Sequence, residues 1–123
     1  PRPLAIDSTG TVYQHETGWT ANGVPLNGTR YAESGAISLG AGDQVATVMQ
    51  MLPDERTLGD TQIQFGTRIY PNGPETVYGP YTLSALTDMR FQARQISAKV
   101  QGVADSDWRV GLPRFEIVAG GRR

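Results

Sequence analysis

The side chains able to perform acid–base chemistry are scattered along the chain. Its one histidine, His15, stands beside Glu16 in a run of residues typical of a β-strand. A histidine with a neighbouring carboxylate can act as a general base, but a histidine on a strand surface needs no such role. Carboxylates that hydrolyse glycosides must face each other across the substrate, and the spacing favours no pair here. The carboxylates considered are Asp7, Glu16, Glu33, Asp54 and Glu75.

Nucleophiles and metal ligands are equally sparse in the sequence. The chain has no cysteine and no G-x-S-x-G motif, which excludes thiolate chemistry and an α/β-hydrolase nucleophile elbow. A metal ion needs several convergent ligands, and the best clusters are Asp54-Glu55 and Asp105-Ser106-Asp107. The second resembles part of a calcium loop but lacks the spacing, glycine and terminal glutamate of an EF-hand. We therefore expect no catalytic residue, no cofactor and no metal site, and hence a protein that is not an enzyme.

Aromatic and basic side chains indicate binding instead. Aromatic residues dominate the energetics of binding surfaces, so those of this chain could contact a sugar or a protein, although packing in the core and at sheet edges explains them as well. Arg90 and Arg94 share one face of a predicted strand, and Lys99 lies on the next strand. Together they suit a basic stripe facing phosphates, but a solvated sheet face, or pairing with carboxylates of a neighbouring subunit, is favoured over it. The candidate interface residues are Trp19, Tyr70, Tyr78, Tyr81, Arg90, Arg94 and Lys99.

These residues are positioned by a predicted β-hairpin over residues 61–83, around which the rest of the chain is organised. Its first half alternates strictly, with Ile63 and Phe65 on the apolar face and glutamine, glycine and arginine on the other. A period of two with β-branched and aromatic residues indicates a half-buried strand. Residues 71–74, with the sequence PNGP, reverse the chain. The returning strand contains Pro80, which confines it to a sheet edge or a bulge.

Before this hairpin the sequence predicts four segments. Residues 4–16 form a smaller hairpin, and the turn-rich residues 17–30 form a long loop. A strand over residues 31–39 follows, with a kink or bulge at Gly35. Residues 44–52 form a strand whose odd-numbered and even-numbered residues face opposite ways. Because both of these faces are apolar, this strand is expected to be central in its sheet.

After the hairpin the sequence predicts strands at residues 89–94, 96–102 and 108–118. The last of them is interrupted at residues 111–113 and followed by a frayed Gly-Gly-Arg-Arg tail. Strands that recur every 8 to 12 residues or so, with turn signals between them and no helical pattern, are typical of a sandwich. The predicted fold is all-β, an antiparallel β-sandwich of about seven or eight strands with a jelly-roll or immunoglobulin-like order.

Length and charge fit a single domain over residues 1–123. A chain of 123 residues can bury a hydrophobic core without metals or disulfides. Its net charge of −1 argues against general adhesion to nucleic acids or membranes, and it lacks both a signal-peptide core and an apolar run of roughly 18 to 20 residues that could span a bilayer. From Asp88 onward seven basic and four acidic residues occur, whereas four basic and eight acidic residues precede it. This asymmetry suits head-to-tail association between copies, although ordinary solvated surface charge also explains it.

A series of blocks spreads along most of the chain. LAIDSTGTVYQHETG and ANGVPL lie near its front, ESGAISLGAGDQ and LPDE in the middle, and FGTRIYPNGPETVYGPYTL after them. The series closes with Arg90, Arg94 and Ile96 in the pattern R-x-x-x-R-x-I, then WRVG, Arg114 and a terminal GGRR. In this order the blocks resemble the C-terminal domain of structural tail proteins from short-tailed, podovirus-like bacteriophages and related prophages.

The resemblance implies a virion structural protein of the tail machine, of the nozzle, hub or adaptor type below the portal. Such proteins work as rings, so the expected partners are further copies of the chain and adjacent tail or portal-adaptor proteins. Passive contact with exiting DNA is a further expectation, and no membrane is expected. The resemblance transfers no catalytic residue. The start at Pro1 rather than Met also leads us to expect a processed chain or one part of a longer tail protein.

Two other classes of function compete with this interpretation. One is a carbohydrate-binding or host-receptor-binding β-sandwich module, motivated by Trp19, Tyr70, Tyr78 and Tyr81. The other is a carboxylate hydrolase, which is the least favoured because enzymes normally bring titratable groups together. Glycan binding that disappears when one of the aromatic residues is replaced would favour the first alternative.

Overall fold

The computed structural model describes residues 2–15, 17–18, 20–21, 23–26, 30–40, 44–83, 85–104 and 107–122. These residues form strands and connecting segments and no helix, so the prediction of an all-β fold is confirmed. The strands are β1 (Leu4–Ile6), β2 (Val12–Gln14), β3 (Thr20–Ala21), β4 (Val24–Pro25), β5 (Tyr31–Glu33), β6 (Ile37–Ser38), β7 (Gln44–Leu52), β8 (Thr61–Arg68), β9 (Thr76–Thr82), β10 (Thr87–Ala93), β11 (Gln95–Gly102) and β12 (Arg114–Arg122).

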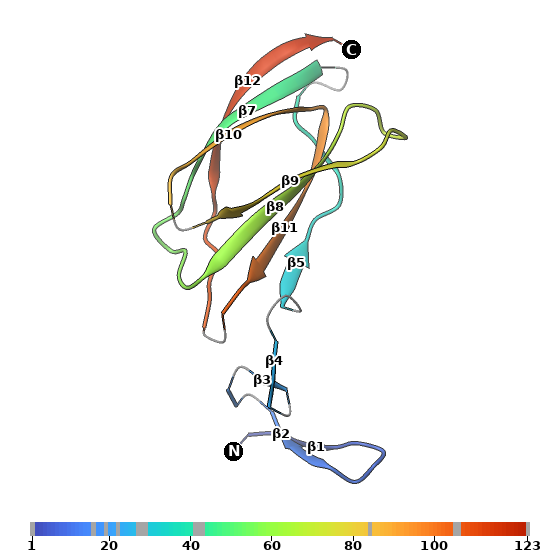
Figure 1. The fold of residues 1–123 in the computed structure, drawn as a ribbon, viewed down its shortest axis with the longest axis vertical. Coiled ribbons are helices and arrows are strands. Elements are labelled where there is room, and N and C mark those ends of the chain that lie inside the picture. Colours follow the sequence, from blue (N-terminus) through green and yellow to red (C-terminus); the bar gives the residue numbers. More distant parts are fainter. Residues whose placement is uncertain are drawn as a thin grey trace.

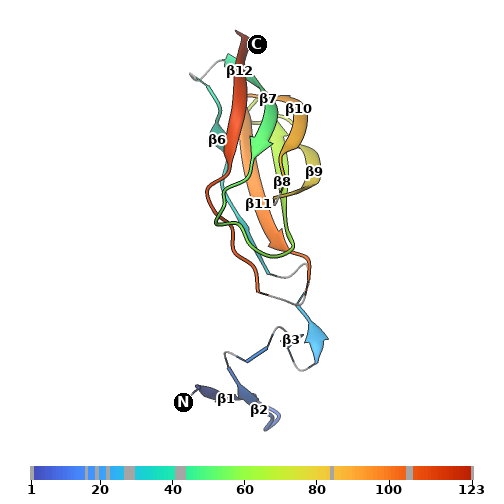
Figure 2. The ribbon, with the colours of Figure 1, turned by 90° about the vertical axis from the view of Figure 1, so that its left-hand side faces the viewer.

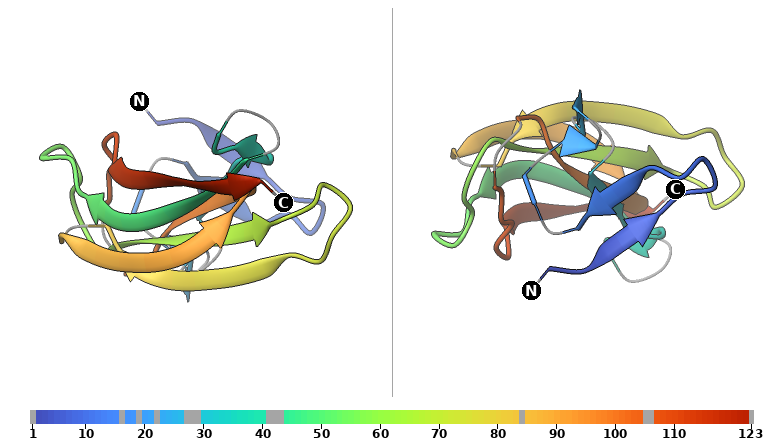
Figure 3. Two further views of the ribbon diagram at one scale, coloured as in Figure 1. Left: turned by 90° about the horizontal axis from the view of Figure 1, so that it is seen from above. Right: turned by 90° about the horizontal axis from the view of Figure 1, so that it is seen from below.

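Two antiparallel sheets make up the body of the molecule. One has the strand order β10-β7-β12, and the other has the order β5-β11-β8-β9, with β6 also paired to β11. The sheets form the two layers of a sandwich (Figure 1), and Figure 3 shows β12 and β9 on opposite sides of it when the molecule is seen from above. The eight strands β5 to β12 confirm the predicted antiparallel sandwich of about seven or eight strands, although their order is not that of a clear jelly roll.

The β8–β9 hairpin forms as predicted. Thr61, Ile63, Phe65 and Thr67 of β8 are buried, and the residues between them are half-buried, so one face of the strand points at the opposite sheet. β9 is an edge strand of its sheet, and its pairing with β8 shifts register where Pro80 lies. The prediction that Pro80 confines this strand to an edge or a bulge is therefore confirmed.

β7 is central in its sheet, as predicted, but its side chains do not alternate as predicted. It lies between β10 and β12, and both pairings shift register at Met49. Val48 and Met51 consequently both reach the core, although an uninterrupted strand would send them to opposite faces. The expectation of one odd-numbered and one even-numbered face is wrong because Met49 is an extra residue of β7 relative to β12, a β-bulge that interrupts the alternation.

The core is centred on Phe65, whose side chain is 1% exposed. Its ring lies 5.4 Å from that of Phe91 on β10 and 5.7 Å, edge-on, from that of Phe115 on β12, both in the opposite sheet. The ring of Tyr81 on β9, in the same sheet as Phe65, lies 6.3 Å away. These separations are those of favourable aromatic pairs, so one ring joins both layers.

Two segments of the first half differ from the prediction. The predicted strand over residues 31–39 is divided into β5 and β6, which both pair with β11. The break at residues 34–36 includes Gly35, where a kink or bulge was predicted. Within the predicted long loop over residues 17–30, β3 and β4 form a two-residue ladder.

The last strand lies further along the chain than predicted. It begins at Arg114 instead of residue 108, and before it Arg109 forms an isolated β-bridge with Leu58. It continues to Arg122, which pairs with Gln44 at the start of β7. The expectation of a frayed tail is therefore wrong as far as Arg122, because β7 is long enough to pair with this part of the chain.

The connection between β7 and β8 is held against the segment before β12. Asp54 accepts hydrogen bonds from the backbone N–H groups of Arg56 at 2.8 Å and Leu112 at 2.9 Å. The hydroxyl of Thr57 accepts a third, from the N–H of Gly111 at 3.1 Å. The bonds from Arg56 and then Leu112 lower the pKa of Asp54 below its usual value of 3.8.

The N-terminal residues form a separate arm, which we define as β1 to β4. β1 and β2 pair around a turn in which the Asp7 carboxylate accepts hydrogen bonds from the N–H groups of Thr9 and Thr11, both at 2.9 Å. Gly10 supplies the positive φ of 87° that this turn requires. Figures 1 and 2 both place the arm beyond one end of the sandwich, with the two chain ends at opposite ends of the molecule. The predicted N-terminal hairpin is confirmed over its described residues.

We expect Phe65→Ala to lower the free energy of unfolding by about 3 to 5 kcal/mol, because it removes the ring that joins the two sheets and leaves a cavity. The matched control is Val77→Ala on β9, whose side chain is exposed and which should change stability by less than about 0.5 kcal/mol. Urea denaturation followed by tryptophan fluorescence measures both. Equal losses for the two variants would contradict the placement of Phe65 in the core.

We expect Asp54→Asn to destabilise the fold at neutral pH, because an amide nitrogen cannot accept the bond from Leu112. Since the folded pKa of Asp54 is depressed, its contribution is present above 3.8 and is lost as the pH falls below that value. The unfolding curves of the wild type and the variant should therefore converge in acid. The control is Glu116→Gln, and a difference between wild type and Asp54→Asn that persists unchanged in acid would contradict the role given to the carboxylate.

Candidate functional site

Three of the predicted interface residues meet at one place. Tyr70, Tyr78 and Arg90 line a groove of about 600 Å³ between the tip of the β8–β9 hairpin and β10. We call it the hairpin groove. The full lining consists of Thr67, Ile69, Tyr70, Gly73, Pro74, Thr76, Tyr78, Arg90, Phe91 and Gln92.

The groove exists because the edge strands of the two sheets approach each other. β9 is an edge of one sheet and β10 is an edge of the other. The ring of Tyr78 on β9 stacks on that of Phe91 on β10, with centroids 5.0 Å apart and planes 20° from parallel. Phe91 is buried whereas Tyr78 is half-buried, so this pair forms an aromatic floor that is partly open to solvent.

The wall on the hairpin side is fixed by contacts on both of its faces. The N–H of Gly73 donates to the carbonyl of Tyr70 at 2.9 Å and closes the turn at the tip. The Thr67 hydroxyl donates to the carbonyl of Thr76 at 3.0 Å across the base of the tip. On the outer face of the sheet the Arg68 guanidinium pairs with the Glu75 carboxylate at 3.3 Å. Tyr70 is 55% exposed and is carried by this braced turn.

The wall on the opposite side comes from β10. Its buried residues Met89, Phe91 and Ala93 alternate with the exposed Arg90 and Gln92, as the sequence predicted. Arg90 and Gln92 therefore bring a guanidinium and an amide to the groove. The combination of aromatic rings, a cation and an amide suits a ligand with an apolar face and an anionic group.

The other predicted interface residues lie elsewhere. Tyr81 packs against Phe65, and burial, followed by the neighbouring Tyr78, raises its pKa. Trp19 lies outside the described residues. Arg94 lies at the corner between β10 and β11, where its backbone N–H donates to the carbonyl of Arg68 at 3.0 Å.

The predicted basic stripe does not form on a single sheet face. Arg90 lies on β10 and Lys99 on β11, and these consecutive strands belong to different sheets. The Lys99 ammonium lies 4.3 Å from the centroid of the Tyr31 ring on β5, a cation–π contact. The less favoured alternative of one stripe is therefore wrong, because the chain crosses from one sheet to the other between the two strands.

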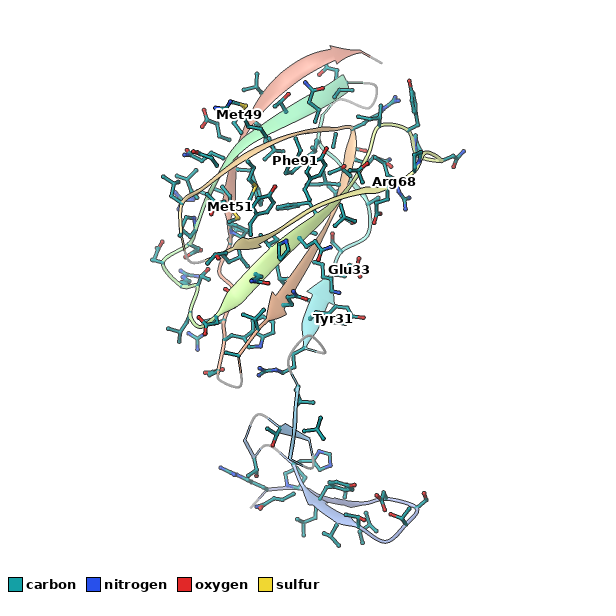
Figure 4. The ribbon with its side chains drawn as sticks, in the orientation of Figure 1. Tyr31, Glu33, Met49, Met51, Arg68 and Phe91 are labelled. Atoms are coloured by element: carbon teal, nitrogen blue, oxygen red, sulfur yellow. The ribbon has the colours of Figure 1, made fainter. Side chains whose placement is uncertain are left out.

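A smaller polar hollow, missed by the sequence reasoning, lies on the outer face of the β5-β11-β8-β9 sheet. It measures about 190 Å³ and brings Glu33 of β5 and Glu75 of the hairpin to one depression. Figure 4 labels Tyr31, Glu33 and Arg68 along this sheet. Gly66 opens the hollow, since a Cβ at this position would lie 2.6 Å from the Glu75 carboxyl carbon. A glycine at an outward position of an otherwise regular strand was the available signal.

The structure adds no support for the candidate acid–base and metal sites that the sequence suggested. His15 lies at the end of the arm hairpin, exposed, and its backbone N–H donates to the carbonyl of Pro3 at 2.9 Å. Glu16, Asp105 and Ser106 lie outside the described residues. Within the part of the chain that the structure describes, no three metal-ligating side chains come together. The described residues also include no helix long and apolar enough to cross a bilayer.

No family model, curated protein or solved structure matches this chain.

Tyr78→Ala should lower the free energy of unfolding by about 2 to 3 kcal/mol, somewhat less than truncation of a fully buried ring, because Tyr78 is half-buried and stacked on Phe91. Tyr70→Ala should cost less than about 0.5 kcal/mol, because its ring is exposed on the wall. Chemical denaturation measures both, and comparable losses would contradict this division between floor and wall.

Proposed function

We propose that this chain is a non-enzymatic structural component of a phage tail machine, in its nozzle, hub or adaptor region, and that it resides in the virion. It acts through interfaces with copies of itself and with adjacent tail or portal-adaptor proteins during assembly and DNA delivery. The series of sequence blocks supports the assignment to a tail, and the exposed apolar face of the arm supports the role of interfaces.

The observation that carries the proposal is the apolar face of the arm. In the β1–β2 ladder Leu4 pairs with Gln14 and Ile6 with Val12, so these four residues share one face. Leu4 is 68% exposed, Ile6 70% and Val12 59%. In the sandwich the corresponding alternation buries one face against a second sheet, whereas among the described residues no second sheet covers the aliphatic side chains of the hairpin.

Such a face is expected to be covered in the working assembly. A lone two-stranded hairpin is marginally stable in water, and burying apolar surface gains roughly 25 cal/mol per Å². The turn at the tip is preformed, and hydrogen bonds from the Thr9 hydroxyl and then the Thr11 N–H lower the pKa of Asp7 to about 2. The arm thus presents an aliphatic face beside a carboxylate that stays ionised, which suits a partner with an apolar strip and a basic rim.

The uneven charge of the chain gives a second reason to expect association between copies. Its acidic front includes the arm, and its basic back includes Arg90 and Arg114, both exposed. Contacts between unlike ends are heterologous, and they produce a ring when the rotation between neighbours closes. Passive contact of such a ring with exiting DNA is part of the same proposal.

We expect Leu4→Ser combined with Ile6→Ser to reduce the fraction of oligomer at a given concentration by at least roughly tenfold, because each change removes burial worth more than 1.4 kcal/mol. Gln14→Ser, on the same face of the same hairpin, is the matched control and should behave as the wild type. Light scattering behind a sizing column, at two protein and two salt concentrations, measures the mass. A wild type that stays monomeric throughout, or a double variant that assembles normally, would count against the proposal.

The assignment to a tail has its own test. A peptide epitope fused to the natural protein can be located by immunogold labelling of particles released from the producing bacteria. Gold on the tails of short-tailed particles is the expected result. Particles that lack the protein would overturn the proposal whatever its mass in solution.

A further inference from the structure

We propose that the hairpin groove is a binding site for a saccharide that bears a carboxylate, such as a sialic-acid or uronic-acid unit. The site would give the chain a recognition function beyond assembly. The hairpin groove is spatially separate from the arm, so this proposal can be tested independently of the function proposed above.

The hairpin groove has an aromatic surface that suits a sugar ring. Sugar rings expose C–H groups on their faces and hydroxyls around their edges, so they pack flat against an aromatic ring and bond outward. The groove offers the ring of Tyr78, supported from below by Phe91 at 5.0 Å, and the exposed ring of Tyr70 on its wall. Pro74 and Ile69 extend the apolar lining beside them.

The hairpin groove also carries a positive charge. Arg90 is the one charged side chain among the described residues that line it. A guanidinium presents a planar fork of donors that matches a carboxylate in a two-pronged arrangement. Gln92 adds an amide two residues along the same strand, on the same side, where it can bond to hydroxyls. The groove is therefore complementary to a ligand with one anionic group and several hydroxyls.

The walls and floor of the hairpin groove are preorganised by contacts within the protein. The turn bond from Gly73 to Tyr70, the bond from Thr67 to Thr76 and the ion pair outside the hairpin hold the wall in place without a ligand. Tyr78 is likewise held by its stack on Phe91. A ligand that enters a braced groove has less ordering to impose on the protein, and this increases affinity.

A saccharide fits this groove better than an extended peptide. A peptide would add as a strand to β9 or β10, but β9 carries Pro80, which has no N–H, and both strands have register shifts that disrupt a regular edge. The volume of about 600 Å³ lies in the usual range of small-molecule sites, roughly 300 to 1,000 Å³. A protein partner would instead need an interface of about 800 Å² on each side.

The first experiment is a glycan array that carries sialic-acid, uronic-acid and neutral oligosaccharides, probed with the full chain. Binding to acidic members and weaker binding to their carboxyl-reduced forms is the expected result. A blank for every acidic glycan would overturn the proposal. Binding of an acidic peptide with a blank array would replace the saccharide by a protein partner and would also overturn it.

Variants then locate the site. Titration of the ¹⁵N-labelled chain with the strongest acidic glycan should shift amide signals of residues 69–78 and 90–92. Arg90→Gln should weaken binding of that glycan by roughly tenfold, the value of one charge-assisted pair, and should leave binding of its carboxyl-reduced form unchanged. Tyr70→Ala should weaken binding of both forms. Arg114→Gln on β12 is the matched control for loss of an exposed arginine, and an equal effect of Arg114→Gln, or shifts confined to other strands, would refute the assignment.

Discussion

The contact of Phe65 with the opposite sheet is the interaction on which the rest of the structure depends. β8 places this ring at the centre of the sandwich, where it meets Phe91 and Phe115 from two strands of the other layer. Each buried aromatic ring removes roughly 150 to 250 Å² from water, so this cluster supplies a large part of the force that holds the two sheets together. The spacing of the sheets, and hence the approach of their edges, follows from it.

The hairpin groove is a consequence of that closure. Phe91, held against Phe65, also contacts Tyr78 on the edge of the opposite sheet, and these two rings stack. The same strand that buries Phe91 must send Arg90 and Gln92 outward because side chains alternate. A buried core and an exposed polar wall are thus two faces of one strand. The braced hairpin tip completes the groove on its other side.

The arm carries the same pattern in a two-stranded pair, which no further described strand joins. Leu4, Ile6 and Val12 share one face of a regular antiparallel pair, as core residues do in the body, but they remain largely exposed. Local hydrogen bonds to Asp7 fix the turn, so the shape is defined while the apolar face stays open. Stability in the body comes from long-range packing. In the arm the described contacts are local, within the β1–β2 and β3–β4 pairs, and the proposed assembly would supply the missing cover.

The sequence by itself determined the strands whose pattern is local: the alternation of β8 and β10, the N-terminal hairpin, the kink near Gly35 and the edge position imposed by Pro80. Only the tertiary structure decided which strands are neighbours. β10 and β11 are adjacent in the chain yet lie in different sheets, so Arg90 and Lys99 never form one stripe, and the bulge at Met49 changes which residues of β7 face the core. The physical reason is that periodicity reports which face of a strand is apolar, whereas sheet membership and register are set by packing between residues far apart in the chain.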